Sequence, residues 1–195
     1  MATNIYDDES HAYYVDGVRL PSVTDICEPI SFRRLTALDN NVLERARARG
    51  SRCHELCEEL LLMGEVDVDE IETEYIPYMQ QFALWRKTYR PKVLYTEKKL
   101  FGTEFCGTTD LVCEIDGKTI LVDYKFTANA DKKSLSVQLE GYHRLCHLHG
   151  IEIDECWYLH VKKDGYVFKK ITRNPQWFDL LLQHNKFMNA KYKGE

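Results

Sequence analysis

Hydrophobic residues recur along this chain at two spacings, which predict an alternation of helices and strands. Apolar positions three or four residues apart, typical of amphipathic helices, occur in the segments 51–63, 75–89, 135–149 and 174–190. Shorter apolar runs bounded by turn residues predict strands over 93–101, 107–127, 155–161 and 166–171, the second of these being two strands joined by a turn. This order indicates an α/β fold with a mixed β-sheet flanked by helices.

About the first 40 residues differ from this core pattern and are expected to form an N-terminal extension of hairpin and helix. An Asp-Gly turn between two short runs predicts a small hairpin over 11–20. Ser22 is placed to cap a short helix, which Pro29 should break. In the next helical segment, Gly50 marks a break or a new N-terminal cap. With no long linker, residues 1–195 are expected to form a single domain.

The composition is that of an ordinary globular chain rather than a membrane or disordered one. Of the 195 residues, 44% are hydrophobic and 29% are charged, and no apolar run approaches the roughly 20 residues needed to span a bilayer. The formal net charge of −5 argues against a protein that holds nucleic acid by overall charge, so any DNA-binding surface should be local. Candidates for such a surface are the basic stretches Arg45–Arg52, Lys98–Lys99 and Lys132–Lys133.

The cysteines bear on the cellular compartment. Seven cysteines, an odd number without disulfide-like spacing, indicate reduced thiols, which are typical of the cytoplasm. The polar, acidic start of the chain does not resemble a secretory signal. A cytoplasmic protein without a membrane partner is therefore expected. The phosphate-binding pattern G-x-x-x-x-G-K-[ST] does not occur in the sequence, so the chain is not expected to use ATP.

The most informative segment is the hairpin over 107–127, because its turn fixes which side chains lie together. An Asp-Gly pair at 116–117 is a strong signal for a two-residue turn, and counting from it places Asp110 directly opposite Asp123. Lys125, two residues further, points to the same face. Two opposed carboxylates repel each other, whereas a divalent cation between them would reverse the sign of that interaction. The pattern therefore predicts a metal site with an ammonium group beside it.

This arrangement resembles the motif of the PD-(D/E)XK nuclease superfamily, in which an Asp precedes a strand that carries (D/E)-X-K. Here Asp110 and the tripeptide Asp123-Tyr124-Lys125 occupy those positions. The restriction-endonuclease-like core of that superfamily, a mixed sheet flanked by helices in the order αβββαβ, is similar to the element order predicted above.

Two flanking motifs narrow the resemblance to the RecB-like exonuclease branch. Upstream, Gly50 and His54 resemble the G-x-x-x-H helix motif of that branch. Downstream, Gln138 and Tyr142 resemble its Q-x-x-x-Y motif. The segment 14–24 is similar to the start of phage-encoded members of this group.

The resemblance implies a set of metal ligands. Asp110 and Asp123 would bind the ion, the backbone carbonyl of Tyr124 would add an oxygen, and His54 would be a further ligand from its helix. Oxygen ligands suit Mg²⁺, and an imidazole raises the tolerance for Mn²⁺. An iron–sulfur cluster, which some relatives bind through a late group of cysteines, is not expected because the sequence has no C-x-x-C pair.

Lys125, Gln138 and Tyr142 complete the implied catalytic set. Lys125 would orient the attacking water or stabilise charge on the scissile phosphate. Gln138 and Tyr142, one helical turn apart, would position the substrate strand or the lysine, and a plain polar pair at a helix–sheet seam is the alternative. Glu58, one turn along the helix that carries the histidine, could hold the imidazole. Glu97, on the strand before the hairpin, is a weaker candidate ligand.

The function that the resemblance implies is that of a metal-dependent DNA exonuclease, which hydrolyses phosphodiester bonds in recombination, repair or phage DNA processing. Its partner would be DNA, single- or double-stranded, at its ends, with a homo-oligomer or recombination and replication proteins as further partners to consider. A structure-specific endonuclease and a catalytically inert nuclease-fold module that binds DNA or protein are the alternatives. A phage-encoded member would act in the cytoplasm of its host.

Overall fold

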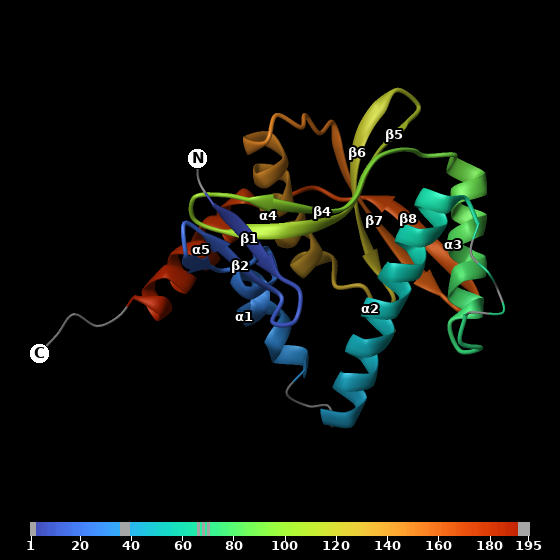
Figure 1. The fold of residues 1–195 in the computed structure, drawn as a ribbon, viewed down its shortest axis with the longest axis horizontal. Coiled ribbons are helices and arrows are strands. Elements are labelled where there is room, and N and C mark those ends of the chain that lie inside the picture. The colour runs from blue at the N-terminus through green and yellow to red at the C-terminus, as the bar shows by residue number, and fades with distance from the viewer. Residues whose placement is uncertain (1–2, 36–39, 66, 68, 70, 191–195) are drawn as a thin grey trace, which may run out of the picture.

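The centre of the molecule, in a computed structural model that describes residues 3–35, 40–65, 67, 69 and 71–190, is a five-stranded mixed sheet (Figure 1). The strands follow one another in space as they do in sequence, and all neighbours are antiparallel except β6 and β7, which are parallel. They are β4 (Lys92–Phe101), β5 (Cys106–Ile115), β6 (Lys118–Lys125), β7 (Glu155–Lys162) and β8 (Gly165–Lys170). The predicted α/β class, with a mixed sheet flanked by helices, is confirmed.

Helices cover both faces of this sheet and enclose two hydrophobic cores. They are α1 (Val23–Leu35), α2 (Asn40–Met63), α3 (Ile76–Tyr89), α4 (Lys132–Leu148) and α5 (Pro175–Asn189). α2 and α3 pack on the face that carries Leu111 and Val122, while α1, α4 and α5 pack on the face that carries Val112 and Leu121. Within the described residues, none of the helices combines the length and the apolar character needed to cross a membrane.

The N-terminal extension forms a separate three-stranded antiparallel sheet beside the β4–β5 pair (Figure 1). Its strands are β1 (Asn4–Asp7), β2 (Ala12–Val15) and β3 (Val18–Leu20). The hairpin expected over 11–20 is confirmed, since Asp16 and Gly17 have φ angles of 50° and 77°, as a two-residue turn of this kind requires. β1 is too short to give a periodic signal in the sequence. The Tyr13 hydroxyl and Thr108 Oγ1, 2.6 Å apart, tie this sheet to β5.

Two helices continue through residues that were predicted to interrupt them. Pro29 lies inside α1 and Gly50 lies inside α2, so both predictions of a break are wrong. The local cost is about 1 kcal/mol for glycine and about 3 kcal/mol for proline, and the packing of each helix outweighs it. Ile26 in α1 and Leu56 in α2 are almost completely buried. The end of the predicted helical segment at residue 63 is confirmed, and Gly64 follows it with a left-handed φ of 88°.

Glu155, at the start of β7, connects three neighbouring strands. Its carboxylate lies 2.6 Å from Lys118 Nζ and 3.0 Å from Lys170 Nζ. The indole N–H of Trp157 donates a further hydrogen bond to it at 2.9 Å. The bonds from Lys118, Trp157 and Lys170, in that order of influence, lower the pKa of Glu155 to about 2. The ionised carboxylate therefore holds together the ends of β6, β7 and β8.

We expect Glu155→Gln to lower the free energy of unfolding at neutral pH. The substitution should also remove the pH dependence that Glu155 gives to the stability of the wild type. Because the pKa is depressed in the folded protein, the stabilisation is complete above the unfolded pKa of 4.5 and is lost as the pH falls towards 2. Urea unfolding of both proteins should show a difference in stability that shrinks below pH 4.5.

The matched control for this experiment is Glu114→Gln. It removes a more exposed carboxylate that is paired only across two strands, with Lys92 Nζ at 3.3 Å. Exposed pairs of this kind contribute little, so the control should change the unfolding free energy only slightly. A wild-type advantage over Glu155→Gln that did not change with pH would contradict the assignment.

Candidate metal centre

The candidate site lies where β5 and β6 separate. Their ladder has the predicted register and ends at the pair Leu111↔Val122. Beyond this pair β5 stays bonded to β4 and β6 to β7, so the two strands diverge into a fork (Figure 1). Asp110 and Asp123, predicted to face each other, occupy the first position past the end of the ladder. Oδ2 of Asp110 accepts a 2.6 Å hydrogen bond from the Tyr124 N–H and so replaces the missing strand partner.

α2 brings His54 to this fork. The neighbouring Cys53 and Cys57 are buried in the core, which holds the helix close to the strands. The His54 ring packs against Tyr124 and Phe126 with centroid distances of 5.6 Å to each. The imidazole is therefore held in place by aromatic packing before any ligand binds.

Three side chains converge on one point: His54 from α2, Glu97 from β4 and Asp110 from β5. His54 Nδ1 lies 3.2 Å from Glu97 Oε1 and 3.5 Å from Asp110 Oδ1. The candidate ligand atoms of these residues all lie within 4.8 Å of one another. The side chains of His54 and Glu97 are 27% and 24% exposed, so the point can be reached from solvent. Glu97, the weaker candidate ligand from the sequence, is thus the acid beside the imidazole. Glu58 was the residue considered for holding the imidazole.

The backbone of Glu97 adopts an unusual conformation that serves this convergence. The register of β4 and β5, which pairs Thr96 with Leu111, sets Glu97 opposite Asp110. Its φ of 43° lies in the left-handed region, which a glutamate within a strand seldom adopts and which costs on the order of 1–3 kcal/mol. Neither the register nor this φ can be read from the sequence, which explains why Glu97 ranked low there.

Asp123 and Lys125 form an ion pair next to this cluster. Lys125 Nζ lies 2.5 Å from Asp123 Oδ2, and the Asp123 side chain is only 3% exposed. The ligand role of Asp123 stays a prediction, because Asp123 is not among the three residues whose ligand atoms converge. The carbonyl of Tyr124 suits its predicted role better, since the N–H and C=O of one strand residue point to the same side and the Tyr124 N–H faces the fork.

Tyr142 reaches the site from α4, together with Gln138. Gln138 Nε2 donates a hydrogen bond to the Tyr142 hydroxyl at 3.2 Å. Gly107 on β5 makes room for the ring, because a Cβ at that position would lie 2.9 Å from Tyr142 Cε1. Burial first, and then the charges of Asp110 and Asp123, raise the pKa of Tyr142 well above its ordinary value. The phenol therefore stays neutral and can donate a hydrogen bond.

The electrostatics of the cluster favour a bound cation. Burial alone would lower the pKa of His54, but Asp110 and Glu97 outweigh it and raise the pKa to about 9. Burial raises the pKa of Asp123 to about 6, against the effect of the Lys125 ammonium. Burial also acts to lower the pKa of Lys125, and the aspartates more than reverse this. At neutral pH a proton on His54 thus balances the carboxylates, and a metal ion could take its place.

The donor set fits a hard divalent cation. Glu97 and Asp110 offer carboxylate oxygens and His54 offers an imidazole nitrogen, a combination that suits Mg²⁺ or Mn²⁺. Adjacent ligands of an octahedral ion at about 2.1 Å lie roughly 3 Å apart. The distances of 3.2 and 3.5 Å from His54 Nδ1 therefore need to change only slightly. Asp110 can bind through Oδ1 while Oδ2 keeps its hydrogen bond from Tyr124.

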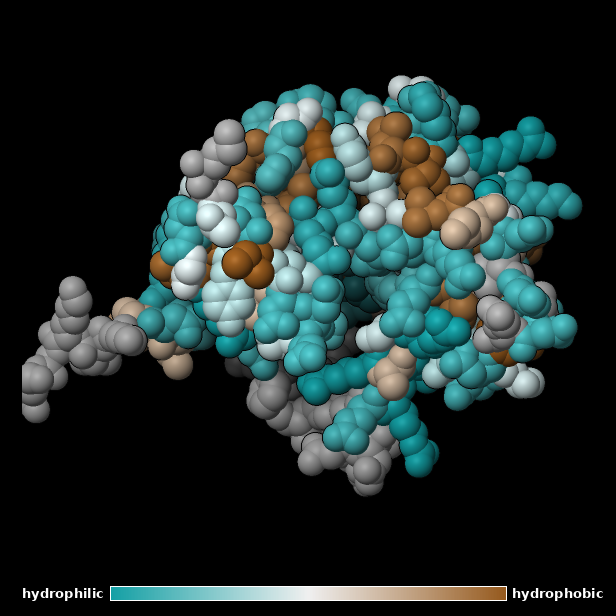
Figure 2. Space-filling model, in the orientation of Figure 1, coloured by the Kyte–Doolittle hydropathy of each residue, from teal (hydrophilic) through white to brown (hydrophobic). Residues whose placement is uncertain are grey.

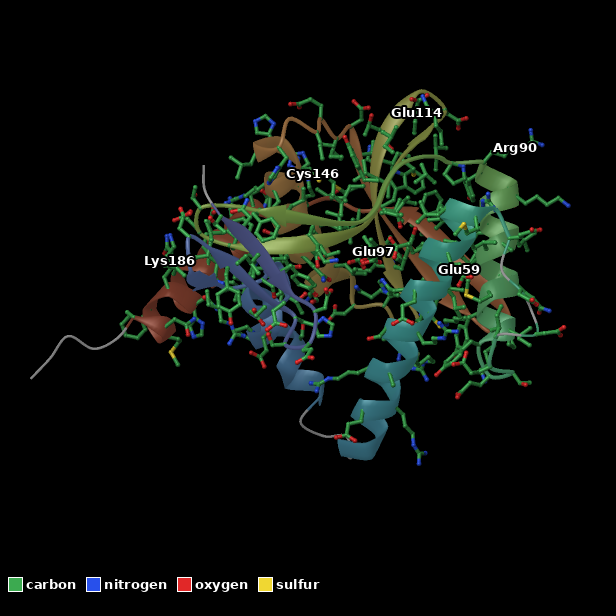
Figure 3. The ribbon with its side chains drawn as sticks, viewed as in Figure 1. Glu59, Arg90, Glu97, Glu114, Cys146 and Lys186 are labelled. Carbon is green, nitrogen blue, oxygen red and sulfur yellow. The ribbon has the colours of Figure 1, made fainter. Side chains whose placement is uncertain are left out.

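The cluster opens into a cleft of about 900 Å³ between the N-terminal sheet and α2. Figure 2 shows a hollow near the middle of this face with mostly hydrophilic surface around it, and Figure 3 shows Glu97 between the sheet and α2. The lining of the cleft includes His54, Glu97, Lys125 and Tyr142. Two of the basic stretches considered for DNA binding reach the cleft, through Arg47 and Lys99. Three of the predicted site residues, His54, Lys125 and Tyr142, therefore share one space with part of the predicted binding surface.

Comparisons with known proteins do not assign this chain to a family. No family model matches the sequence, and no curated protein matches it. A solved structure described as the crystal structure of SSO0001 aligns with a TM-score of 0.37 and 13% sequence identity, over 60% of this chain and 59% of that chain. A similarity of this size supports no statement about fold or function, so the site is interpreted from its own geometry.

We expect Mg²⁺ or Mn²⁺ to stabilise the folded protein through Glu97. At a metal concentration about 100 times the dissociation constant, binding to the folded state alone adds about 2.7 kcal/mol to the free energy of unfolding. EDTA should remove this increment, and Glu97→Gln should abolish most of it because a carboxylate ligand is lost. Chemical unfolding with and without the metal measures both effects.

Glu58→Gln is the matched control for this measurement. Glu58 lines the same cleft and follows His54 by one helical turn, but it is not among the three converging residues. The metal should therefore stabilise this variant as much as the wild type. Equal stabilisation of wild type and Glu97→Gln would show that the ion binds elsewhere.

Proposed function

We propose that this protein is a DNA exonuclease that depends on Mg²⁺ or Mn²⁺ and hydrolyses phosphodiester bonds in recombination, repair or phage DNA processing. The observation that carries the proposal is the convergence of His54, Glu97 and Asp110 on one point of a cleft that Lys125 also lines. Carboxylates, an imidazole and an ammonium group in this relation suit the hydrolysis of a phosphate ester. The resemblance of the sequence motifs to RecB-like nucleases supports the same reaction.

The side chains of the site would divide between holding the ion and stabilising charge. His54, Glu97 and Asp110 would hold the metal, which when bound lowers the pKa of a coordinated water and neutralises charge on the phosphate. Lys125 would stabilise the negative charge that develops on the phosphate oxygens. Its ammonium group is already fixed by Asp123 at 2.5 Å, so it needs little reorganisation during the reaction.

Tyr142 would position the substrate strand in the same cleft. Because its hydroxyl accepts a hydrogen bond from Gln138, its own proton is available for a phosphate oxygen. The N-terminal sheet and α2 border the cleft on two sides. The preference for an exonuclease over an endonuclease rests on the resemblance of the His54 and Gln138–Tyr142 motifs to those of end-processing RecB-like nucleases.

The central test is nuclease activity with Mg²⁺ or Mn²⁺ on linear DNA. We expect the wild type to release nucleotides and Lys125→Ala to be slower by about 10²–10³-fold, because it removes a positive charge that stabilises the reacting phosphate. Asp123→Ala should also be slower, because it removes the carboxylate that fixes the Lys125 ammonium. Lys92→Ala, which removes an ammonium that is 70% exposed and paired with Glu114, should cut at the wild-type rate. A wild type without activity on DNA or RNA would instead favour an inert nuclease-fold module.

An exonuclease requires a DNA end and an endonuclease does not, so this requirement distinguishes the two activities. Linear DNA should be degraded, while a covalently closed circle of the same sequence should persist until it is nicked or linearised. Gel electrophoresis of the two substrates over the same time course provides the comparison. Rapid cutting of closed circles would overturn the exonuclease assignment and favour a structure-specific endonuclease.

A further inference from the structure

The two walls of the 900 Å³ cleft differ in chemistry. The N-terminal sheet presents rings: Tyr6 lies 4.8 Å from the Tyr13 ring and 6.4 Å from the His11 ring, measured between centroids. Lys99 Nζ lies over the Tyr6 ring at 4.7 Å. Tyr6, His11, Tyr13 and Lys99 all line the cleft. This wall therefore combines a half-buried aromatic ring with a cation, two features that bind nucleobases and phosphates.

The opposite wall, formed by α2, carries small side chains as well as the charged Arg47, Glu55 and Glu58. Ala46, Gly50 and Ser51 face the cleft one to two turns before His54. Gly50 is not required by internal packing, since a Cβ added there would meet no atom within 4 Å. A glycine inside a helix is destabilising relative to alanine. The position thus keeps the cleft open at a cost that the fold itself does not explain.

Electrostatic attraction alone does not explain how this cleft would bind an anionic ligand. The basic residues in its lining are Arg19, Arg47, Lys99 and Lys125. The acidic residues in its lining are Asp8, Asp25, Glu55, Glu58 and Glu97. With the two signs nearly balanced, binding must draw on another attraction, and the aromatic wall provides one.

We infer that the cleft binds a single strand of nucleic acid with one base stacked on the Tyr6 ring, an inference that rests on the proposed nuclease function. Tyr6 lines the same cleft as His54 and Glu97 of the metal cluster, so neighbouring parts of one strand can reach both the ring and the cluster. Lys99, which lies over the Tyr6 ring, would move to a phosphate oxygen and leave the face of the ring to a base. Stacking on an aromatic face accepts any base, so the cleft would be sequence-tolerant. A paired base cannot stack in this way, so a duplex must open first.

Equilibrium binding of a fluorescein-labelled single strand of about 12 nucleotides tests the inference. Fluorescence anisotropy is measured in EDTA, where binding is separated from metal and from cleavage. Tyr6→Ala should bind about 5- to 150-fold more weakly, the range for loss of one stacked base. Tyr6→Leu should be weakened similarly, and Tyr6→Phe should bind nearly as the wild type does. The leucine variant keeps apolar bulk in β1, so a loss in both cannot be attributed to unfolding.

Tyr14→Ala is the matched control, because Tyr14 belongs to the adjacent strand and is not part of the described cleft lining. It should bind the strand like the wild type. A second comparison changes the ligand: a strand of abasic nucleotides should bind the wild type more weakly than the normal strand does. Tyr6→Ala should bind the normal and the abasic strand equally well, since the ring on which a base would stack is gone.

Gly50→Leu tests the opposite wall. A leucine should raise the free energy of unfolding, because it favours a helix and its Cβ meets no atom within 4 Å, yet its side chain should block the strand. Loss of binding together with a gain in stability is therefore expected. Binding at wild-type strength would show that the strand does not pass this wall.

The outcomes separate this inference from the proposed function. If the wild type cuts DNA but Tyr6→Ala and Tyr6→Leu bind the strand normally, the stacking wall is wrong and the nuclease assignment stands. If Tyr6-dependent binding is found without cleavage in any metal, the wall stands and the nuclease assignment fails. Equal competition by a blunt duplex of the same sequence would overturn the preference for a single strand.

Discussion

Three carboxylates crowd the fork between β5 and β6, and their mutual repulsion is the constraint to which the surrounding structure responds. Each has a cationic partner: Glu97 and Asp110 face the His54 imidazole, and Asp123 faces Lys125. In surroundings of low effective dielectric such charges need compensation, because an unpaired buried charge costs several kcal/mol. A positive charge at the cluster is therefore part of the charge balance of the fold, whether a proton or a metal ion supplies it.

The divergence of β5 and β6 makes this concentration of charge geometrically possible. Where the ladder ends at Leu111↔Val122, the sheet would otherwise leave backbone groups unpaired, and the Asp110 side chain satisfies one of them. The fork stays in place because β5 and β6 each keep their other neighbour. Hydrophobic cores on both faces add further support and offset the strained backbone at Glu97.

The parts of this site that sequence could predict are those set by short-range geometry. A two-residue turn fixes a hairpin register, so the pairing of β5 and β6 as far as Leu111↔Val122 followed from counting residues, whereas the end of the ladder just before Asp110 and Asp123 did not. Glu97 depended on the pairing of a third strand and on a left-handed backbone angle, which no local pattern encodes. The wrong breaks at Pro29 and Gly50 have the same origin, since local preferences of a few kcal/mol yield to tertiary packing.

The separate N-terminal sheet has a consequence for how this chain can change over time. The cluster and its lysine all come from the segment 54–125, whereas Asn4–Leu20 contributes only to the wall of the cleft. The hydrogen bond between Tyr13 and Thr108 is one of the ties between the two parts. Substitutions in the first strands can therefore alter which molecules enter while leaving the reactive groups untouched. Selectivity and chemistry occupy different stretches of the gene and can evolve at different rates.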